Sequence, residues 1–355
     1  MTFYLIFYVT IVLLLLLDLC ARNIPLPSVR QRSPFFAIAV FVTVFVSGFR
    51  YNTGYDFLHY VQFYREHPPA GMEPLFAYSV TFFNYFTDDP QLMFFTYSLA
   101  TVSILLLAIK RFTKYTKTSF LIFLLVPGFF INSFSIIRQS LAMVILFYGM
   151  SFLILDDRKG KFLIISSVSA MLHYSAVFPA LLFLLGGTFL RKEYRLNTLI
   201  GLALLSLVLC YFDVARFMGC FSIGRYSQYI DSKQAISPIK ILILNLFVFF
   251  LLLNRRQFVE NSSDTFLLNS MFIGVLITNF FSDFLPLVRF SYYFLIAEIT
   301  LIPKLIYAFK DNNMRCVYLL AFMCCHAALM INAMLVDLNF DYYPKMIPYV
   351  NYFFK

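Results

Sequence analysis

Residues 33–60 read SPFFAIAVFVTVFVSGFRYNTGYDFLHY, in which an apolar run passes without a spacer into a polar stretch that begins at Arg50. As a helix, residues 33–49 would cover roughly 26 Å at about 1.5 Å per residue, enough to cross a thin bilayer. The next eleven residues offer a guanidinium, a carboxylate, an imidazole, a turn glycine and three tyrosines. Because only 13% of the chain is charged, this concentration predicts part of a site outside a membrane, where phosphate and sugar are handled.

The composition predicts an all-α membrane protein. The chain has 355 residues, of which 61% are hydrophobic, and its mean hydropathy is +0.79. A soluble protein could not cover this much apolar surface, and a β-barrel would show short alternating strands in place of long apolar runs. We therefore expect a polytopic transmembrane helical bundle of about 10–12 membrane helices with short re-entrant or interfacial elements. Residues 1–355 are expected to form a single integral membrane domain.

The net charge of +10 is compatible with a nucleic-acid partner, but the placement of the charge argues against one. Eighteen of the 28 Lys and Arg residues fall in six short clusters between apolar runs. This is the positive-inside pattern of cytoplasmic loops, and membrane orientation explains it without nucleic acid. The clusters are Arg22/Arg30/Arg32, Lys110/Arg111/Lys114/Lys117, Arg158/Lys159/Lys161, Arg191/Lys192/Arg195, Arg255/Arg256 and Lys304/Lys310/Arg315.

Two irregular elements keep all six clusters on one side of the membrane. Residues 75–86 are too short for a span and suit a re-entrant or interfacial helix, and residues 162–190 suit a tight hairpin that turns near His173. In the rival topology each of these segments is one full span, which would put Arg138 and two basic clusters on unexpected sides. The preferred topology places extracytoplasmic loops at about residues 50–74 and 213–238 and an extracytoplasmic tail at about residues 337–355.

Two of the expected crossings contain features that bear on the site. Residues 120–137 are expected to cross outward as a helix kinked at Pro127-Gly128. Residues 290–302 are expected to cross inward and contain Glu298. A carboxylate inside a span is either an intramembrane functional residue or a hydrogen-bonding partner of a neighbouring helix.

Four arginines are predicted at outer span ends, where orientation rules disfavour them. Arg138 lies between two apolar runs, and an Arg within a span costs about 2.5–3.5 kcal/mol on insertion scales, so it usually faces a cavity or a partner. A guanidinium binds phosphate oxygens through two hydrogen bonds and stays charged, so we expect these arginines to bind a diphosphate. The alternatives are interfacial snorkelling, a loop ion pair or a lipid-headgroup contact. The residues are Arg50, Arg138, Arg225 and Arg289.

Three residues on the same outer side are candidates for catalysis. Asp56 and Glu73 could each act as a general base, and His173 could act as an acid–base group or donate to a phosphate. The simpler alternatives are that Asp56 pairs with Arg50 or His59 to shape the loop, and that His173 is a hydrogen-bonded packing residue. The sequence has no DxD motif, P-loop, HExxH or GxSxG, and its six Cys lack metal-ligand spacing. We expect neither a cofactor nor a metal.

Several short motifs together resemble a known family, the EpsG-like, Wzy-type polysaccharide polymerases of bacteria. The first is Arg-x-Asn-x-Gly-x-Asp-(x)₃-Tyr at residues 50–60. One departure is Tyr55, where the family often has a small residue. The other matches, in chain order, are Glu73-Pro74-Leu75-Phe76, Ile137-Arg138-Gln139-Ser140-Leu141-Ala142, Leu172-His173-Tyr174-Ser175-Ala176 and the looser Arg225-Tyr226 and Arg289-Phe290-Ser291-Tyr292-Tyr293-Phe294.

The resemblance implies a GT-C-like membrane glycosyltransferase that polymerises oligosaccharide repeat units carried on undecaprenyl diphosphate. It would act on the outer face of the bacterial cytoplasmic (inner) membrane and make O-antigen, capsule or exopolysaccharide. The arginines would stabilise the departing diphosphate, and Tyr51, Tyr60 and Tyr226 would bind sugars. The expected partners are the lipid-linked oligosaccharide, the lipid bilayer, and a chain-length regulator and flippase of the same pathway.

The alternative function is a flippase or transporter of a lipid-linked glycan or another anionic substrate. Outer arginines and an intramembrane Glu298 would serve that role as well. A flippase should carry charged cavity residues at both membrane faces and internal repeats, and neither is evident in this sequence.

Overall fold

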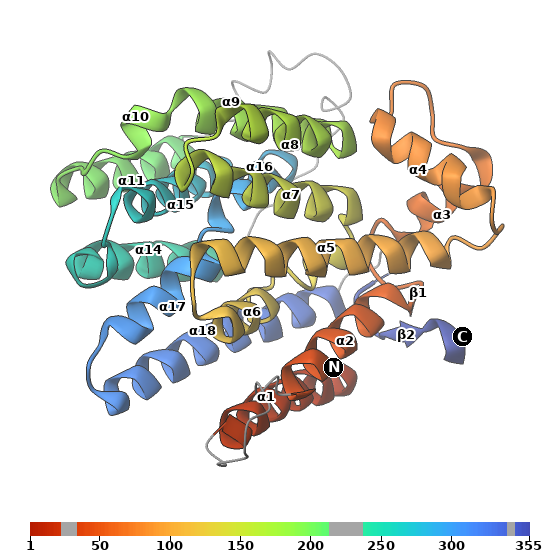
Figure 1. The fold of residues 1–355 in the computed structure, drawn as a ribbon, viewed down its shortest axis with the longest axis horizontal. Helices are drawn as coiled ribbons and strands as arrows, with labels where there is room; N and C mark the ends of the chain where they lie inside the picture. The colour runs from red at the N-terminus through yellow and green to blue at the C-terminus, as the bar shows by residue number, and fades with distance from the viewer. Residues whose placement is uncertain (23–33, 213–236, 339–344) are drawn as a thin grey trace.

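In the computed structural model, described residues 1–22, 34–212, 237–338 and 345–355 are almost entirely helical (Figure 1). One short antiparallel sheet pairs β1 (Arg50–Tyr51) with β2 (Val350–Asn351). The expected all-α class is confirmed. The helices are α1 (Thr2–Arg22), α2 (Pro34–Gly48), α3 (Phe57–Glu66), α4 (Pro74–Asn84), α5 (Gln91–Phe112), α6 (Thr116–Leu125), α7 (Ile137–Ile154), α8 (Lys159–Leu172), α9 (Val177–Leu185), α10 (Gly187–Leu190), α11 (Leu196–Tyr211), α14 (Pro238–Phe258), α15 (Ser262–Phe280), α16 (Leu285–Leu295), α17 (Glu298–Ala308) and α18 (Asn312–Leu338), with 3₁₀ turns η1 (Asn132–Phe134), η2 (Tyr174–Ala176) and η3 (Tyr352–Phe354).

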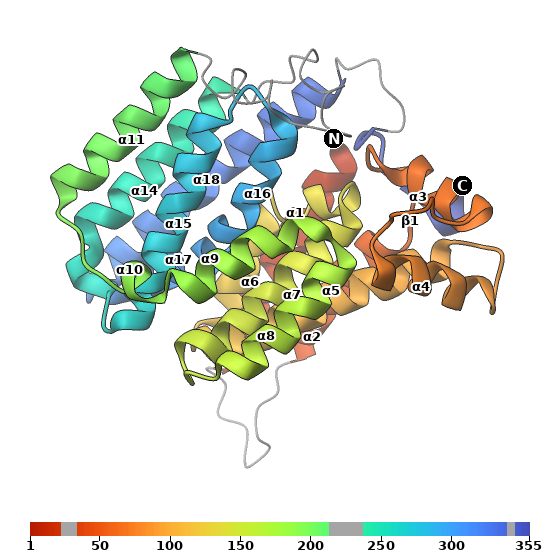
Figure 2. The same cartoon turned by 90° about the horizontal axis from the view of Figure 1, so that it is seen from above.

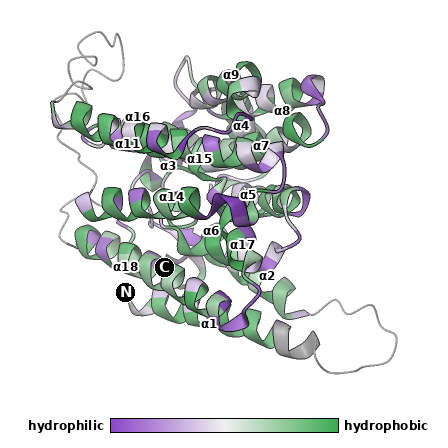
Figure 3. Ribbon diagram, turned by 90° about the vertical axis from the view of Figure 1, so that its left-hand side faces the viewer, coloured by the Kyte–Doolittle hydropathy of each residue, from purple (hydrophilic) through white to green (hydrophobic). Residues whose placement is uncertain are grey.

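The helices are long and apolar enough for a multi-pass membrane protein. Among the described residues, α5, α7, α14 and α18 meet the length and hydropathy needed to cross a bilayer, and α16 with α17 adds a fifth span if the bent pair is one crossing. Figure 3 shows hydrophobic residues along most of the helical ribbon. Helix α7 lies at the centre, with 89% of its apolar window buried, whereas α14 and α18 have 17% and 22% buried. The first residues of α7 are therefore held inside the bundle.

The basic clusters that the structure describes come together at one end. Arg111, at the end of α5, forms an ion pair of 2.6 Å with Asp156, which follows α7. Arg191, after α10, donates to the backbone oxygen of Ile154 at 3.2 Å. Both ends of the segment 162–190 therefore lie on one side, and the chain reverses at His173 as predicted.

The first loop and the C-terminal tail meet at the opposite end. The amide of Tyr352 donates to the oxygen of Phe49 at 2.7 Å, and the amide of Gly54 donates to the oxygen of Lys345 at 3.0 Å. Figures 1 and 2 both show the C-terminus beside β1 and α3. These are two of the segments that the charge pattern assigns to the outside, so the structure brings them together.

Two expected crossings are broken in the structure. The prediction of one kinked helix over residues 120–137 was wrong: α6 ends at Leu125, and α7 begins only at Ile137. Pro127 has no N–H for a helical hydrogen bond and disfavours helical geometry at Val126, which is extended at φ −74° and ψ 111°. The expected crossing at residues 290–302 is divided between α16 and α17, which meet at an angle of 41°. Glu298 is the first residue of α17.

Candidate active site

Glu73 occupies the position before the first turn of α4 and joins two distant segments. Its side chain is buried, and its Oε2 accepts a hydrogen bond of 2.5 Å from Nη1 of Arg138. Its Oε1 lies 2.8 Å from Nδ1 of His173 and 3.4 Å from the amide nitrogen of Tyr174. Burial acts to raise the pKa of Glu73, but the His173 hydrogen bond and the Arg138 charge outweigh it and hold the pKa at about 2. Glu73 is therefore ionised at neutral pH.

Arg138 lies in the first turn of α7 and packs against α3 and α4. Its guanidinium carbon is 4.7 Å from the ring centre of Phe76 on α4 and 5.7 Å from that of Tyr60 on α3. One Glu73 oxygen pairs with it, and in the described part of the chain its buried Nε has no hydrogen-bond partner. The guanidinium thus retains capacity for an anionic ligand.

His173 forms the turn between α8 and the 3₁₀ turn η2. Because an ionised carboxylate can only accept hydrogen bonds, the Nδ1 that faces Glu73 carries the proton. In the neutral imidazole this leaves Nε2 as an acceptor. The side chain is 26% exposed, so His173 is held by Glu73 yet remains accessible. The arrangement suits a general base.

Tyr60 lies beside Arg138 and is subject to the charges of Asp56 and Arg289. Burial is the largest cause of the raised pKa of Tyr60; Arg138 and Arg289 oppose the rise, and Asp56 adds to it. The charges of Arg138, Arg289 and Asp56 therefore all influence the hydroxyl group of Tyr60. Asp56 precedes α3 and forms no side-chain cap there. Of the residues predicted to act in catalysis and diphosphate binding, the structure brings Glu73, Arg138 and His173 into direct contact.

A hydrogen-bonded frame ties α16 to this group. Nε2 of Gln139 donates to the backbone oxygen of Arg289 at 2.7 Å. The hydroxyls of Ser175 and Tyr293 are 2.9 Å apart. The sequence motifs contain all four residues, but Gln139 and Tyr293 were not predicted to be positioning groups. Gln139 follows Arg138 directly, and Tyr293 is four residues after Arg289 in the same motif. These positions were the sequence signal that could have identified them.

The short motifs at Glu73, Arg138, His173 and Arg289 therefore meet at one place in the fold. The chain matches the EpsG family over residues 34–351. It belongs to the EpsG family. Membership indicates a membrane protein with a role in polysaccharide polymerisation. No curated protein and no solved structure matches the chain.

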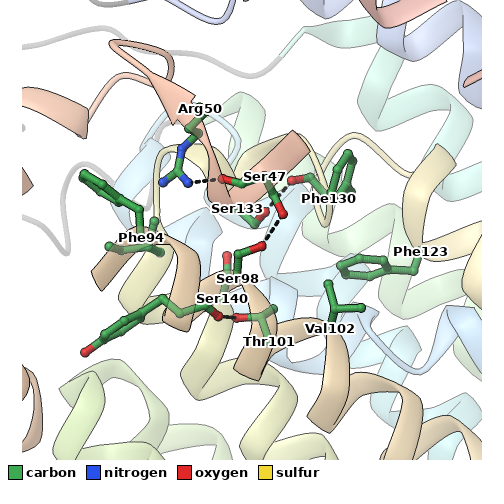
Figure 4. A pocket seen from close by; sticks show the side chains of 12 residues that line it. Ser47, Arg50, Phe94, Ser98, Thr101, Val102, Phe123, Phe130, Ser133 and Ser140 are labelled. Atoms are coloured by element: carbon green, nitrogen blue, oxygen red, sulfur yellow. Dashed lines mark hydrogen bonds between the residues drawn. The ribbon is translucent and has the colours of Figure 1, made fainter. Parts of the chain in front are cut away.

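Arg50 of this EpsG-family chain is 1% exposed and binds backbone oxygens. Its Nη1 donates to the Ser47 oxygen at 2.5 Å, and its Nε and Nη2 donate to the Phe134 oxygen at 3.3 and 3.1 Å. Burial lowers its pKa to about 10. Figure 4 shows its guanidinium above a small pocket of about 20 Å³ lined by Ser47 and Ser98. These contacts connect the first loop to the segment before α7, and diphosphate binding by Arg50 stays a prediction.

The predicted sugar-binding tyrosines are only partly placed. Tyr60 is buried beside Arg138. Tyr51 lies on β1, exposed by 36%, and the ammonium group of Lys355 is 5.0 Å from its ring centre. Arg225 and Tyr226 lie outside the described residues. Within the described ranges, no group of three or more His, Cys, Asp or Glu side chains could hold a metal ion.

Proposed function

We propose that this EpsG-family protein is a glycosyltransferase that polymerises oligosaccharide repeat units carried on undecaprenyl diphosphate into a surface polysaccharide. The observation that carries the proposal is the bridging position of Glu73, which holds an arginine with one oxygen and a histidine with the other. A sugar hydroxyl needs a base to become a nucleophile, and a diphosphate leaving group needs positive charge. The group offers both functions at the outer end of the bundle.

His173 is the proposed base. Its Nε2 takes the proton from the acceptor sugar hydroxyl, while Glu73 holds Nδ1–H and stabilises the imidazolium that forms. The acceptor oxygen then bonds to the anomeric carbon of the donor unit as the bond between that carbon and the diphosphate oxygen breaks. The electron pair of the broken bond leaves with the diphosphate. Glu73, whose pKa is held at about 2, is a weak base and acts as the positioning residue.

Arg138 and Arg289 are the proposed diphosphate-binding residues. Negative charge grows on the departing diphosphate, and guanidinium groups in a partly buried site stabilise it more than they would in water. Asp56 acts in this proposal on the acceptor sugar, where its half-exposed carboxylate can accept hydrogen bonds from hydroxyl groups.

The charge pattern assigns this site to the outer face of the bacterial cytoplasmic membrane. The basic clusters at the opposite end, including Arg111 and Arg191, would face the cytoplasm. The polymerase would then receive units that a flippase has already moved outward and would work with a chain-length regulator.

The test is a glycan-length assay in a strain deleted for the gene. The strain is complemented with wild type, Arg138→Ala, His173→Ala or the control Arg65→Ala, at matched membrane levels. Arg65 is an exposed cation at the end of α3. We expect long glycans with wild type and Arg65→Ala, and single repeat units with the other two.

Two results would contradict the proposal. If Arg138→Ala and His173→Ala polymerise normally, the site is elsewhere. If the deletion strands lipid-linked units on the cytoplasmic face, the protein is a flippase.

A further inference from the structure

A large cavity lies beside the candidate active site and is separate from the pocket under Arg50. Its volume is about 350 Å³, within the range of about 300–1,000 Å³ that is typical of small-molecule sites. Helices α14, α16, α17 and α18 and the segment between α6 and α7 form its walls. Most of the wall is apolar, with Leu244 and Phe247 on α14, Leu295 on α16 and Met330 on α18 among the lining residues.

Two cations line one part of this cavity. Lys240 is in the first turn of α14, and its ammonium nitrogen is 5.6 Å from the ring centre of Tyr292. Arg289 is three residues before Tyr292 on α16, so both cations neighbour Tyr292. Both are half-buried, and neither forms an ion pair in the part of the chain that the structure describes.

The carboxylates that line the cavity already have partners. Oε1 of Glu298 lies 3.3 Å from Nε2 of His326, and both residues are 3% exposed. Asp337 accepts hydrogen bonds from the amides of Met346 and Ile347, at 3.2 and 2.9 Å. The cavity therefore has an apolar wall, two carboxylates that already have hydrogen-bond partners, and two cations that form no ion pair with any described residue.

Arg289 connects this cavity to the candidate active site. Its side chain lines the cavity, while its backbone oxygen accepts the hydrogen bond from Gln139, the neighbour of Arg138. Its charge also acts at Tyr60, which packs under Arg138. A ligand headgroup bound between Lys240 and Arg289 would thus lie on the side of the cavity nearest the proposed base.

We infer that this cavity binds a phosphate-headed amphiphile, the isoprenoid diphosphate of the donor substrate. Lys240 and Arg289 bind the diphosphate, and the apolar wall packs against the first isoprene units. The inference rests on the proposed function, because that function requires the donor diphosphate to depart beside the base. It adds Lys240 and the cavity to the site and assigns them to the donor lipid.

The two cations, which pair with no carboxylate among the described residues, favour a diphosphate over a bilayer phospholipid. A diphosphate ester carries two or more negative charges, whereas the phosphodiester of phosphatidylglycerol carries one. Charged groups in a largely apolar cavity are costly unless they are paired, so ligand charge should match the two cations. The single chain of an isoprenoid also needs less room than two acyl chains.

The absence of tryptophan from the chain allows a direct binding test. Phe247 lines the cavity, so Phe247→Trp places one fluorophore at the proposed site in an otherwise Trp-free protein. The purified full-length variant is titrated with farnesyl diphosphate, farnesol, inorganic diphosphate and phosphatidylglycerol. Binding of radiolabelled farnesyl diphosphate to wild type checks that the new side chain has not altered the cavity.

We expect saturable binding of farnesyl diphosphate, with an affinity about tenfold lower in both Lys240→Gln and Arg289→Gln. Arg65→Gln, at an exposed cation outside the cavity, should bind as the parent does. Farnesol should bind weakly and be insensitive to both substitutions. The inference is overturned if phosphatidylglycerol binds as tightly as farnesyl diphosphate, if the substitutions leave affinity unchanged, or if neither protein binds the probe.

This readout is independent of polymerisation. Suppose that glycans lengthen normally and require Arg138, while Lys240→Gln leaves the affinity for farnesyl diphosphate unchanged. The cavity assignment then fails and the proposed function stands. If farnesyl diphosphate binds through Lys240 and Arg289 while the deletion strain still makes long glycans, the cavity assignment stands and the proposed function fails.

Discussion

Nδ1 of His173 lies 2.8 Å from Oε1 of Glu73, although 100 residues separate the two in the chain. The same carboxylate holds Arg138 through its other oxygen. The proposed base and the proposed anion-binding group therefore share one orienting residue. This arrangement explains why we assign deprotonation to His173 and positioning to Glu73, and it makes the two roles separable by substitution.

Substituting Glu73 should slow polymerisation less than substituting His173. Glu73→Gln keeps an acceptor for Nδ1–H but removes the negative charge that stabilises the imidazolium, so we expect a rate loss of about 10- to 100-fold. His173→Ala removes the base itself, and we expect a loss of about 10²- to 10⁴-fold. Initial rates in proteoliposomes measure both. The control is Glu66→Gln, since the Glu66 carboxylate contacts Gln62 in an exposed position.

The double variant distinguishes this mechanism from two independent contributions. If Glu73 acts through His173, Glu73→Gln should add little to the loss already caused by His173→Ala. Losses that multiply would contradict a positioning role for Glu73.

The Glu73 ion pair should make stability depend on pH in the acid range. The folded-state pKa of about 2 is below the ordinary 4.5, so the unfolded chain binds the proton at higher pH. The stabilisation is complete above about pH 4.5 and is lost as the pH falls toward 2. Thermal unfolding of wild type and Glu73→Gln at pH 6 and pH 3 checks this. The advantage of wild type should shrink at pH 3, and a constant difference would show that the carboxylate charge does not stabilise the fold.

The helical class and the two ends of the bundle could be predicted from the sequence, for a physical reason. Long apolar runs must be helical in a bilayer, and basic clusters mark one side. The turn at His173 follows from the same rule, because residues 162–190 lie between two basic clusters that must be on one side. The same charge pattern predicts that Glu73, Arg138 and His173 lie on one side of the membrane.

The contacts within that side could not be predicted. Glu73 and Arg138 are 65 residues apart, and no periodic pattern reports a tertiary ion pair. Motif position also did not distinguish Arg138, which faces a neighbouring carboxylate, from Arg50, which binds backbone oxygens. Lys240 was missed, although a lone cation at an outer helix end departs from the positive-inside pattern as the four arginines do.

Arg50 should matter more for stability than for binding. Its guanidinium satisfies the oxygens of Ser47 and Phe134, and each buried carbonyl left without a donor costs about 1–3 kcal/mol. Arg50→Gln should therefore lower the unfolding temperature in detergent and the amount of folded protein in membranes. A variant of normal thermal stability that does not polymerise would instead support the prediction that Arg50 binds diphosphate.

Gly54 should be intolerant of any side chain, because it packs directly against the backbone of the segment before α7. Its φ of +105° is unfavourable for other residues, and a Cβ would lie 2.4 Å from the backbone oxygen of Phe134, which cannot rotate away. Gly54→Ala should destabilise the protein by about 1–3 kcal/mol.

The matched control is Gly201→Ala, in the middle of α11, where no atom lies within 4 Å of the new methyl group. Alanine favours a helix over glycine, so this variant should equal or exceed wild type in unfolding temperature. The Phe134 oxygen that Gly54→Ala would displace is the oxygen that binds Arg50. Gly54→Ala and Arg50→Gln should therefore be less than additive in a double variant, whereas Gly201→Ala and Arg50→Gln should add. Full additivity of the first pair would show that the two residues do not hold the same junction.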